Sequence, residues 1–261
     1  MRILISNDDG INNSALWALV RALQPLGEVI VAAPDRNRSG VGTGLTLHDP
    51  VRFREIYSRA DGVRAYGVEG TPGDAVIMGL RHLAGGPVDA VVTGINPGNN
   101  VSHDVLISGT VGAALQGYLN GAAAMAVSVG LIEEADDETV QAIVRSVAAE
   151  LAKKTTPRPF LANLNFPRLV VGPIRGARKT IAAPRPVEDR VEPGGRGNDQ
   201  HFWILRRAGV HADYESLPPD SDISALHEGF VSISSLSWQL ASDIEEPALD
   251  RLVEAACSAL A

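Results

Sequence analysis

The chain has 261 residues, a formal net charge of −8 and a pI of about 5.2. Its 45% hydrophobic and 21% charged residues are typical of a soluble globular protein, and its length lies within the range of a single α/β domain. The acidic balance argues against nonspecific binding to nucleic acid or to an anionic membrane.

The cysteine content and the lack of long apolar segments limit the compartment and the partners that we expect. Cys257 is the only cysteine, which excludes a disulfide framework or a cysteine-rich zinc site within one chain. The start of the chain lacks a signal-peptide pattern, and no apolar run has membrane-spanning length. We therefore expect a cytoplasmic protein whose partners include neither nucleic acid nor a membrane.

Apolar runs and helical patterns alternate over the first 130 residues. The runs at 2–6, 28–33, 89–92 and 124–129 predict buried parallel strands. Helices are predicted over 16–23, 71–83 and 110–119. The second of them has Thr71 as N-cap, Pro72 in the first turn and Asp74 closing a capping box. This alternation indicates parallel strands with right-handed crossovers.

Two later segments depart from this alternation. Residues 51–68 alternate apolar and charged side chains around a turn at 60–62, which predicts an antiparallel hairpin added to the sheet. The acidic run at 133–138 is expected to cap a helix over 138–154 and to face water.

The last third of the chain is less regular. Strands are predicted at 202–205 and 230–233, a protruding arm at 184–200, and an amphipathic helix over 247–260. The fold class is thus α/β: a Rossmann-like, mostly parallel sheet flanked by helices, with an appended antiparallel hairpin and a C-terminal oligomerisation extension. We expect one domain over 1–261, with a catalytic core over 1–167 and an extension over 168–261.

Polar residues follow each predicted parallel strand at its carboxyl end. Asp8 and Asp9 follow the first strand, Ser39 lies in the loop after the second, and Asn96 and Asn100 lie in the loop after the third. These loops should meet in one crevice. Their oxygen donors suit Mg²⁺ or Mn²⁺, which would also relieve the repulsion between the adjacent acids. An Asx turn with a solvated second acid is the alternative.

Ser108, Gly109 and Thr110 directly precede an apolar helix. A helix N-terminus offers free N–H groups to an anion, and Gly109 permits close approach to the backbone. Capping of the helix by Thr110 is the simpler interpretation, and it is compatible with anion binding. A cation beside such a cradle implies a phosphate ester attacked by a metal-activated water.

Five motifs carry a family resemblance: ILISNDDG at 3–10, APDRNRSG at 33–40, GTPGD at 70–74, GIN at 94–96 and SGTV at 108–111. In this order they closely resemble the SurE family, the survival-protein-E type 5′-nucleotidases. The resemblance implies metal-dependent hydrolysis of nucleoside 5′-monophosphates, with activity on other phosphomonoesters or on polyphosphate left open. It also implies dimers or tetramers formed through exchanged C-terminal segments.

The resemblance also assigns residues and a cofactor. The implied ligands of one divalent ion per subunit, Mg²⁺ or Mn²⁺ and in crystals also Ca²⁺, are Asp8, Asp9, Ser39 and Asn96. Asp8 and Asp9 are also the catalytic candidates, and which of them orients the water is open. The candidates for contact with the substrate phosphate are Asn12, Asn100, Ser108, Gly109 and Thr110.

Other functions are weighed against this one. A non-catalytic nucleotide-binding α/β protein is suggested by the glycines at 40–44, but no helical pattern follows them. A haloacid-dehalogenase-type phosphatase would need Asp-x-Asp, whereas Asp8 and Asp9 are adjacent. A structural protein that has lost activity would not need the full set of oxygen ligands. His103 could approach the phosphate or could be an ordinary surface histidine.

Overall fold

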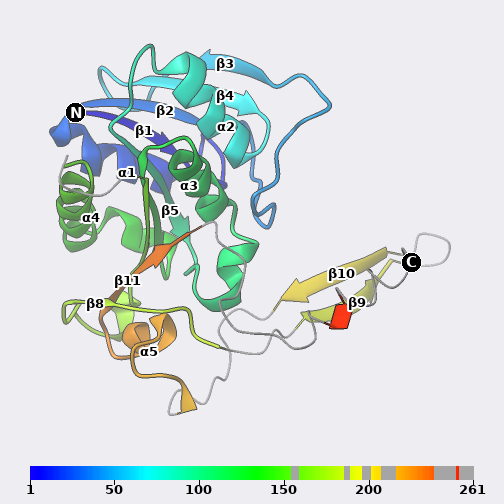
Figure 1. Ribbon diagram of the computed structural model, residues 1–261, viewed down its shortest axis with the longest axis vertical. Coiled ribbons are helices and arrows are strands. Elements are labelled where there is room, and N and C mark those ends of the chain that lie inside the picture. Colours follow the sequence, from blue (N-terminus) through cyan, green and yellow to red (C-terminus); the bar gives the residue numbers. More distant parts are fainter. Residues whose placement is uncertain (154–158, 185–188, 196–200, 207–215, 238–250, 253–261) are drawn as a thin grey trace.

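A nine-stranded sheet forms the centre of the molecule (Figure 1). The computed structural model describes residues 1–153, 159–184, 189–195, 201–206, 216–237 and 251–252. In order across the sheet, the strands are β3 (Arg52–Ile56), β4 (Arg64–Glu69), β2 (Glu28–Pro34), β1 (Arg2–Ser6), β5 (Ala90–Pro97), β6 (Ala123–Val129), β7 (Phe160–Asn165), β11 (Val231–Leu236) and β8 (Ala177–Lys179).

The six strands from β4 to β7 run parallel to one another, and four of them, β1, β2, β5 and β6, match the predicted parallel strands. At one side of this block β3 is antiparallel to β4, and at the other β11 is antiparallel to β7. The predicted hairpin at 51–68 is therefore confirmed as the β3–β4 pair. The predicted strand at 89–92 is longer in the structure, because β5 continues to Pro97 and carries Asn96.

Helices cover both faces of the sheet (Figure 1). They are α1 (Ser14–Leu23), α2 (Pro72–Met78), α3 (Gly109–Leu119), α4 (Glu138–Leu151) and, beside β11, α5 (Asp222–His227). Ile3 and Ile5 are buried in a core with residues of α1 and α4, and Leu4 in a second core with residues of α2 and α3. Alternate residues of β1 thus bury on opposite faces, where each contributes about 1.5–3 kcal/mol.

The predicted N-cap residue is confirmed for one helix and is wrong for another. Thr71 and Asp74 form the predicted capping box of α2. The predicted capping of the next helix by Thr110 is wrong, because Ser108 is the N-cap of α3 and its hydroxyl accepts from Val111 N at 3.1 Å. Thr110 instead lies inside the first turn, where its hydroxyl is available for another contact.

Short helical turns connect the longer elements. Four are 3-10 turns and the second is a π-helical continuation of α2: η1 (Gln24–Leu26), η2 (Gly79–Leu83), η3 (Ser102–Leu106), η4 (Ile132–Asp136) and η5 (Leu169–Val171).

The acidic run at 133–138 does not face water throughout. Asp137 caps α4, as expected for an acid at a helix start. Glu134, however, is buried, and its carboxylate accepts from Leu131 N at 2.9 Å and from Leu169 N at 2.7 Å. The prediction fails at Glu134 because these backbone donors compensate its burial.

A separate two-stranded sheet extends from the main body (Figure 1). β9 (Asp189–Gly194) and β10 (His201–Arg206) pair in antiparallel fashion, so the described part of the arm predicted at 184–200 forms a hairpin with the strand predicted at 202–205. The C-terminal helix predicted over 247–260 lies outside the described residues except for Arg251 and Leu252, which are helical. Among the described residues no helix is long and apolar enough to cross a membrane.

Candidate active site

Asp8 and Asp9 lie in a tight turn at the carboxyl end of β1. The Asn7 side chain closes this turn, since its Nδ2 donates to Gly10 O and its Oδ1 accepts from Gly10 N, both at 3.2 Å. Gly10 has φ +98°, and a Cβ there would lie 2.8 Å from the carbonyl carbon of Arg36. Only glycine fits this position without strain, so the turn holds two adjacent carboxylates at the sheet edge.

The Asp8 carboxylate lies against the N-terminus of α3. Thr110 Oγ1 donates a hydrogen bond to Asp8 Oδ1. Gly109 packs on the same side chain, because a Cβ at Gly109 would lie 2.7 Å from Asp8 Cβ and 2.9 Å from Asp8 Oδ2. Ser108, the helix cap, is buried one residue earlier. The structure thus brings one predicted metal ligand together with the predicted phosphate-binding segment.

The loop after β2 joins the same turn. Arg38 N donates to Asp8 O at 2.7 Å, and Asn37 Nδ2 donates to Asp9 Oδ1 at 3.3 Å. Ser39 is exposed, and its N–H donates to Asn37 Oδ1 at 2.8 Å. Asn37 therefore links Asp9 to the predicted ligand Ser39. The sequence analysis did not select Asn37, although its place in the motif at 33–40 was a signal for it.

Asn96 reaches this edge from β5, the strand beside β1. The register pairs Ser6 with Thr93, so the residues that follow each strand leave the sheet on the same side. Asn96 Nδ2 donates to Gly98 O at 2.6 Å, which orients the side-chain amide. Its Oδ1 has no hydrogen-bond partner within the described part of the chain, and this oxygen is the atom that a cation would use.

Asn100 belongs to a buried network of asparagines. Its N–H donates to Asn165 Oδ1 at 2.7 Å, and its Nδ2 donates to Ser128 Oγ at 2.9 Å. Its carbonyl oxygen accepts from Asn163 Nδ2 at 2.9 Å and Asn165 Nδ2 at 3.1 Å. These bonds fix the loop that follows Asn96 onto β6 and β7, which gives Asn100 a structural task in addition to its predicted one.

Two other candidates, Asn12 and His103, lie at the surface, as does Arg36 of the motif at 33–40. Asn12 is exposed, and its Oδ1 accepts from Arg59 Nη2 at 3.5 Å. His103 is exposed on η3, with its Nδ1 3.4 Å from Ser102 Oγ. Arg36 is exposed beside Asp35. The described contacts do not bring any of the three to Asp8 or Asp9.

Burial and mutual repulsion perturb the two acids. Burial raises the pKa of Asp8, while hydrogen bonds from Thr110 and from the backbone of Gly109 act in the opposite direction. Burial and then repulsion from Asp8 raise the pKa of Asp9 to about 6. Asp9 Oδ2 is buried with no hydrogen-bond partner among the described residues. A buried carboxylate oxygen in this state is destabilising unless a proton or a cation compensates it.

The donor set fits a hard divalent cation. Carboxylate, hydroxyl and amide oxygens are the ligands that Mg²⁺ and Mn²⁺ prefer, and the orphan oxygen of Asp9 needs a positive partner. No cluster of three or more His, Cys, Asp or Glu suited to a metal exists in the described ranges. A cation here would therefore depend on neutral oxygens from Ser39 and Asn96 as well as on the two acids.

Comparison with known proteins decides the family. The family described as survival protein SurE matches residues 3–189. A protein named 5′-nucleotidase SurE from Dehalococcoides mccartyi (strain CBDB1) is 43% identical over 242 residues, which are 92% of this chain and 90% of the relative. The chain belongs to the SurE family. A second 5′-nucleotidase SurE, from Synechococcus sp. (strain JA-3-3Ab), is 38% identical over 92% of this chain and 93% of its own.

A solved structure supports the SurE fold. The crystal structure of the SurE protein from Aquifex aeolicus resembles this chain with a TM-score of 0.77 and 29% sequence identity. The match covers 97% of this chain and 100% of that one. The sequence resemblance to the SurE family is therefore confirmed over nearly the whole chain, including the parts where the motifs are sparse.

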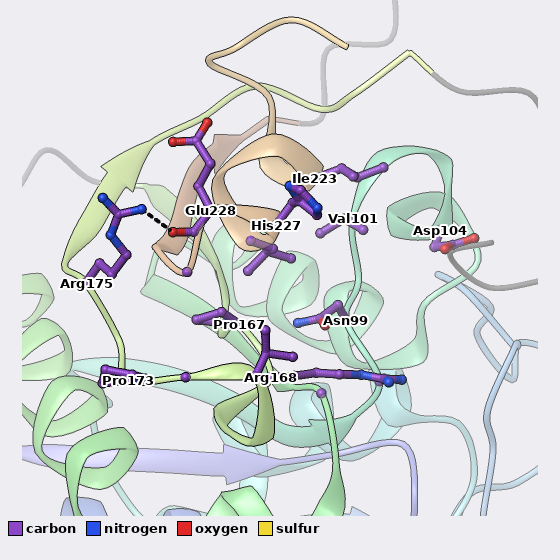
Figure 2. A pocket seen from close by; sticks show the side chains of 16 residues that line it. Asn99, Val101, Asp104, Pro167, Arg168, Pro173, Arg175, Ile223, His227 and Glu228 are labelled. Atoms are coloured by element: carbon purple, nitrogen blue, oxygen red, sulfur yellow. Dashed lines mark hydrogen bonds between the residues drawn. The ribbon is translucent and has the colours of Figure 1, made fainter. Parts of the chain in front are cut away.

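A cleft that sequence reasoning missed lies beside the site of this SurE-family chain. It has a volume of about 760 Å³ and lies between α5 and the segment at 167–173, with Asn99 between them (Figure 2). Its walls come from four separate stretches of the chain (98–104, 130, 167–175 and 223–229), and no single stretch carries a recognisable binding motif. Only the folded chain brings these residues together.

Proposed function

We propose that this chain hydrolyses nucleoside 5′-monophosphates to a nucleoside and inorganic phosphate, with one divalent cation per subunit, Mg²⁺ or Mn²⁺. The relatives named 5′-nucleotidase SurE align over 92% of the chain, which supports the activity. One observation carries the chemistry: the unpartnered Asp9 Oδ2 lies beside an Asp8 that is bonded to the N-terminus of α3.

Asp8, Asp9, Ser39 and Asn96 would hold the cation. When bound, it would screen the charge of the phosphoryl group and lower the pKa of a coordinated water. Of the two acids, Asp8 already accepts from Thr110, whereas Asp9 has a free oxygen. Asp9 is therefore the better candidate to orient the attacking water and to take its proton.

The start of α3 would receive the substrate phosphate. The first N–H groups of a helix have no partner within the helix, and the helix dipole favours an anion there. Gly109 keeps this surface free of a side chain, and Thr110 supplies a hydroxyl beside Asp8. A phosphate held here would present its phosphorus to the water, so that the new P–O bond forms as the bond to the nucleoside 5′-oxygen breaks.

We assign supporting roles to Ser108 and Asn100, and a substrate contact to Asn12. Ser108 holds the helix start through Val111, and Asn100 holds the loop behind Asn96. Asn12 is exposed, which leaves it free to contact the substrate from the solvent side.

The domain organisation, self-association and location of the chain are part of the same proposal. We retain one domain over 1–261, with the catalytic core at 1–167 and the extension at 168–261. Self-association as a dimer or tetramer would use the extension, because Phe202, Trp203 and Ile204 of the projecting hairpin are 63%, 62% and 78% exposed. A cytoplasmic location stays a prediction that rests on the single cysteine, Cys257.

Phosphate release tests the activity. The chain is incubated with each nucleoside 5′-monophosphate in EDTA and after addition of Mn²⁺ or Mg²⁺, alongside Asp8→Asn. We expect release only with metal, and a loss of at least 100-fold in the variant. Binding of nucleotide without release in any metal would favour the non-catalytic alternative, and full activity of Asp8→Asn would reject the assigned site. Parallel assays with other phosphomonoesters and polyphosphate define the breadth of the substrate range.

A further inference from the structure

We infer that the cleft beside α5 holds the nucleoside part of the substrate, with Arg168 as a specificity-determining residue for the base. This inference rests on the proposed function and names the part of the substrate that the metal site leaves unassigned. The cleft volume of about 760 Å³ lies within the range of small-molecule sites, about 300–1,000 Å³.

Hydrogen bonds link the wall of the cleft to the proposed cation site and to the proposed phosphate site. Gly98, in its wall, accepts the hydrogen bond from Asn96 Nδ2 at 2.6 Å. Asp104, also in its wall, accepts through its carbonyl oxygen from Ser108 N at 3.1 Å. The nucleoside is one ester bond away from the phosphorus, so its pocket must adjoin the residues that hold cation and phosphate. This cleft meets that condition through the single segment 96–108.

The walls suit a nucleobase more than a second anion. Val101 and Ile223 face the cleft from one side and Pro167 from the other, with Val171 and Leu226 also lining it (Figure 2). Such apolar walls can cover the flat faces of a base. A chain of phosphates would instead need several cations along the cleft.

Among the described residues that line the cleft, Arg168 is the arginine whose guanidinium stays free. Its guanidinium has no hydrogen-bond or ion-pair partner among the described residues, whereas Arg175, across the cleft, donates to Glu228 O at 3.1 Å (Figure 2). A guanidinium only donates hydrogen bonds, so it selects an edge of the base that carries acceptors, and its plane can also stack on a ring.

Arg168 is held in place by its neighbours. The buried carboxylate of Glu134 accepts from the N–H of the next residue, Leu169, at 2.7 Å. Gly130 lies under the aliphatic part of the Arg168 side chain, because a Cβ at Gly130 would lie 2.5 Å from Arg168 Cγ. A glycine and a buried acid from the segment after β6 thus orient a cation that belongs to the segment after β7, as a binding site requires.

Two variants test the cleft against a matched control. Arg168→Ala removes the donor, Ile223→Trp fills the cleft, and Arg54→Ala removes an exposed arginine of β3, the strand at the opposite edge of the sheet. KM and kcat are measured for a nucleoside 5′-monophosphate and for glycerol phosphate, which has no base. We expect both cleft variants to raise KM about tenfold for the nucleotide, or about 1.4 kcal/mol, and to change kcat/KM for glycerol phosphate less than twofold. Arg54→Ala should match the wild type.

A binding measurement separates the two proposals. Saturation-transfer NMR with a free nucleoside in EDTA reports on the cleft without any hydrolysis. Nucleoside binding that is lost in Arg168→Ala supports the cleft even if the wild type releases no phosphate, in which case only the proposed function fails. Three results would overturn the proposed role of the cleft without contradicting the metal site. They are an unchanged KM in both variants, an equal loss of kcat/KM with both esters, and no nucleoside binding by the wild type.

Discussion

Asp9→Asn is expected to stabilise the metal-free protein near neutral pH while it removes the response to a divalent cation. Burial and then repulsion from Asp8 raise the pKa of Asp9 from 3.8 to about 6 in the folded chain. Between these two values the unfolded chain has lost its proton and the folded chain has kept it. Ionised Asp9 therefore lowers the free energy of unfolding progressively as the pH rises from about 4 to about 6.

The shift of about two pKa units corresponds to about 3 kcal/mol at 1.4 kcal/mol per unit. Asp9 is only partly buried, and solvent screening reduces this figure to about 1–2 kcal/mol. Asparagine has no charge to desolvate, and its oxygen can still accept from Asn37 Nδ2. The expected gain in the free energy of unfolding is thus about 1–2 kcal/mol at pH 7.5, and a few tenths of a kcal/mol at pH 4.

Urea denaturation in EDTA at both pH values measures this gain, with Asp49→Asn, an exposed loop acid, as the control. Mn²⁺ at 100 times its dissociation constant should stabilise the wild type by about 2.7 kcal/mol and Asp9→Asn far less. The reasoning is refuted if Asp9→Asn gains no stability in EDTA at pH 7.5, or if Mn²⁺ stabilises it as much as the wild type.

Three further variants test the supports of the site and the proposed self-association. Gly109→Ala should abolish phosphate release and lower the melting temperature, since the new Cβ would lie 2.7 Å from Asp8 Cβ; normal activity would contradict the packing. Asp74 accepts from Thr46 N at 3.0 Å and Thr46 Oγ1 at 2.6 Å. Asp74→Asn should therefore lower stability by about 1–3 kcal/mol and weaken Mn²⁺ binding in calorimetry by freeing the loop of Ser39. Phe202→Ser with Ile204→Ser should lower the mass in light scattering, whereas Tyr57→Ser, an exposed control, should not.

The local patterns of the sequence predicted the core well. Apolar runs predicted the parallel strands β1, β2, β5 and β6, and Thr71 to Asp74 predicted a capping box that the structure confirms. These signals are local, because side-chain periodicity and capping depend on residues a few positions apart. The wrong expectation for Glu134 has the opposite cause: its burial depends on Leu169, which is 35 residues away.

In the candidate site, too, the sequence predicted the local features and not the contacts between residues far apart in the chain. Residue type and position at strand ends select Asp8, Ser39 and Asn96 as candidate ligands, and this assignment stays a prediction. The contact between Asp8 and Thr110 joins residues 102 positions apart, and sequence could place them only at the same edge of the sheet. The cleft with Arg168 had no sequence signal, because its walls meet only after the segments around Val101, Pro167 and Ile223 have folded together.

Protein contacts position the oxygens of Asp8. Arg38 N–H from the loop after β2 and Thr110 Oγ1 from α3 both donate to this residue, so hydrogen bonds join three elements there. Cation binding should therefore leave the fold unchanged, unlike metal sites that form only as the chain folds. On addition of EDTA we expect phosphate release to stop while the far-UV circular dichroism and the slow amide exchange of Val111 and Gly112 persist. Loss of that protection on chelation would show instead that the start of α3 depends on the cation.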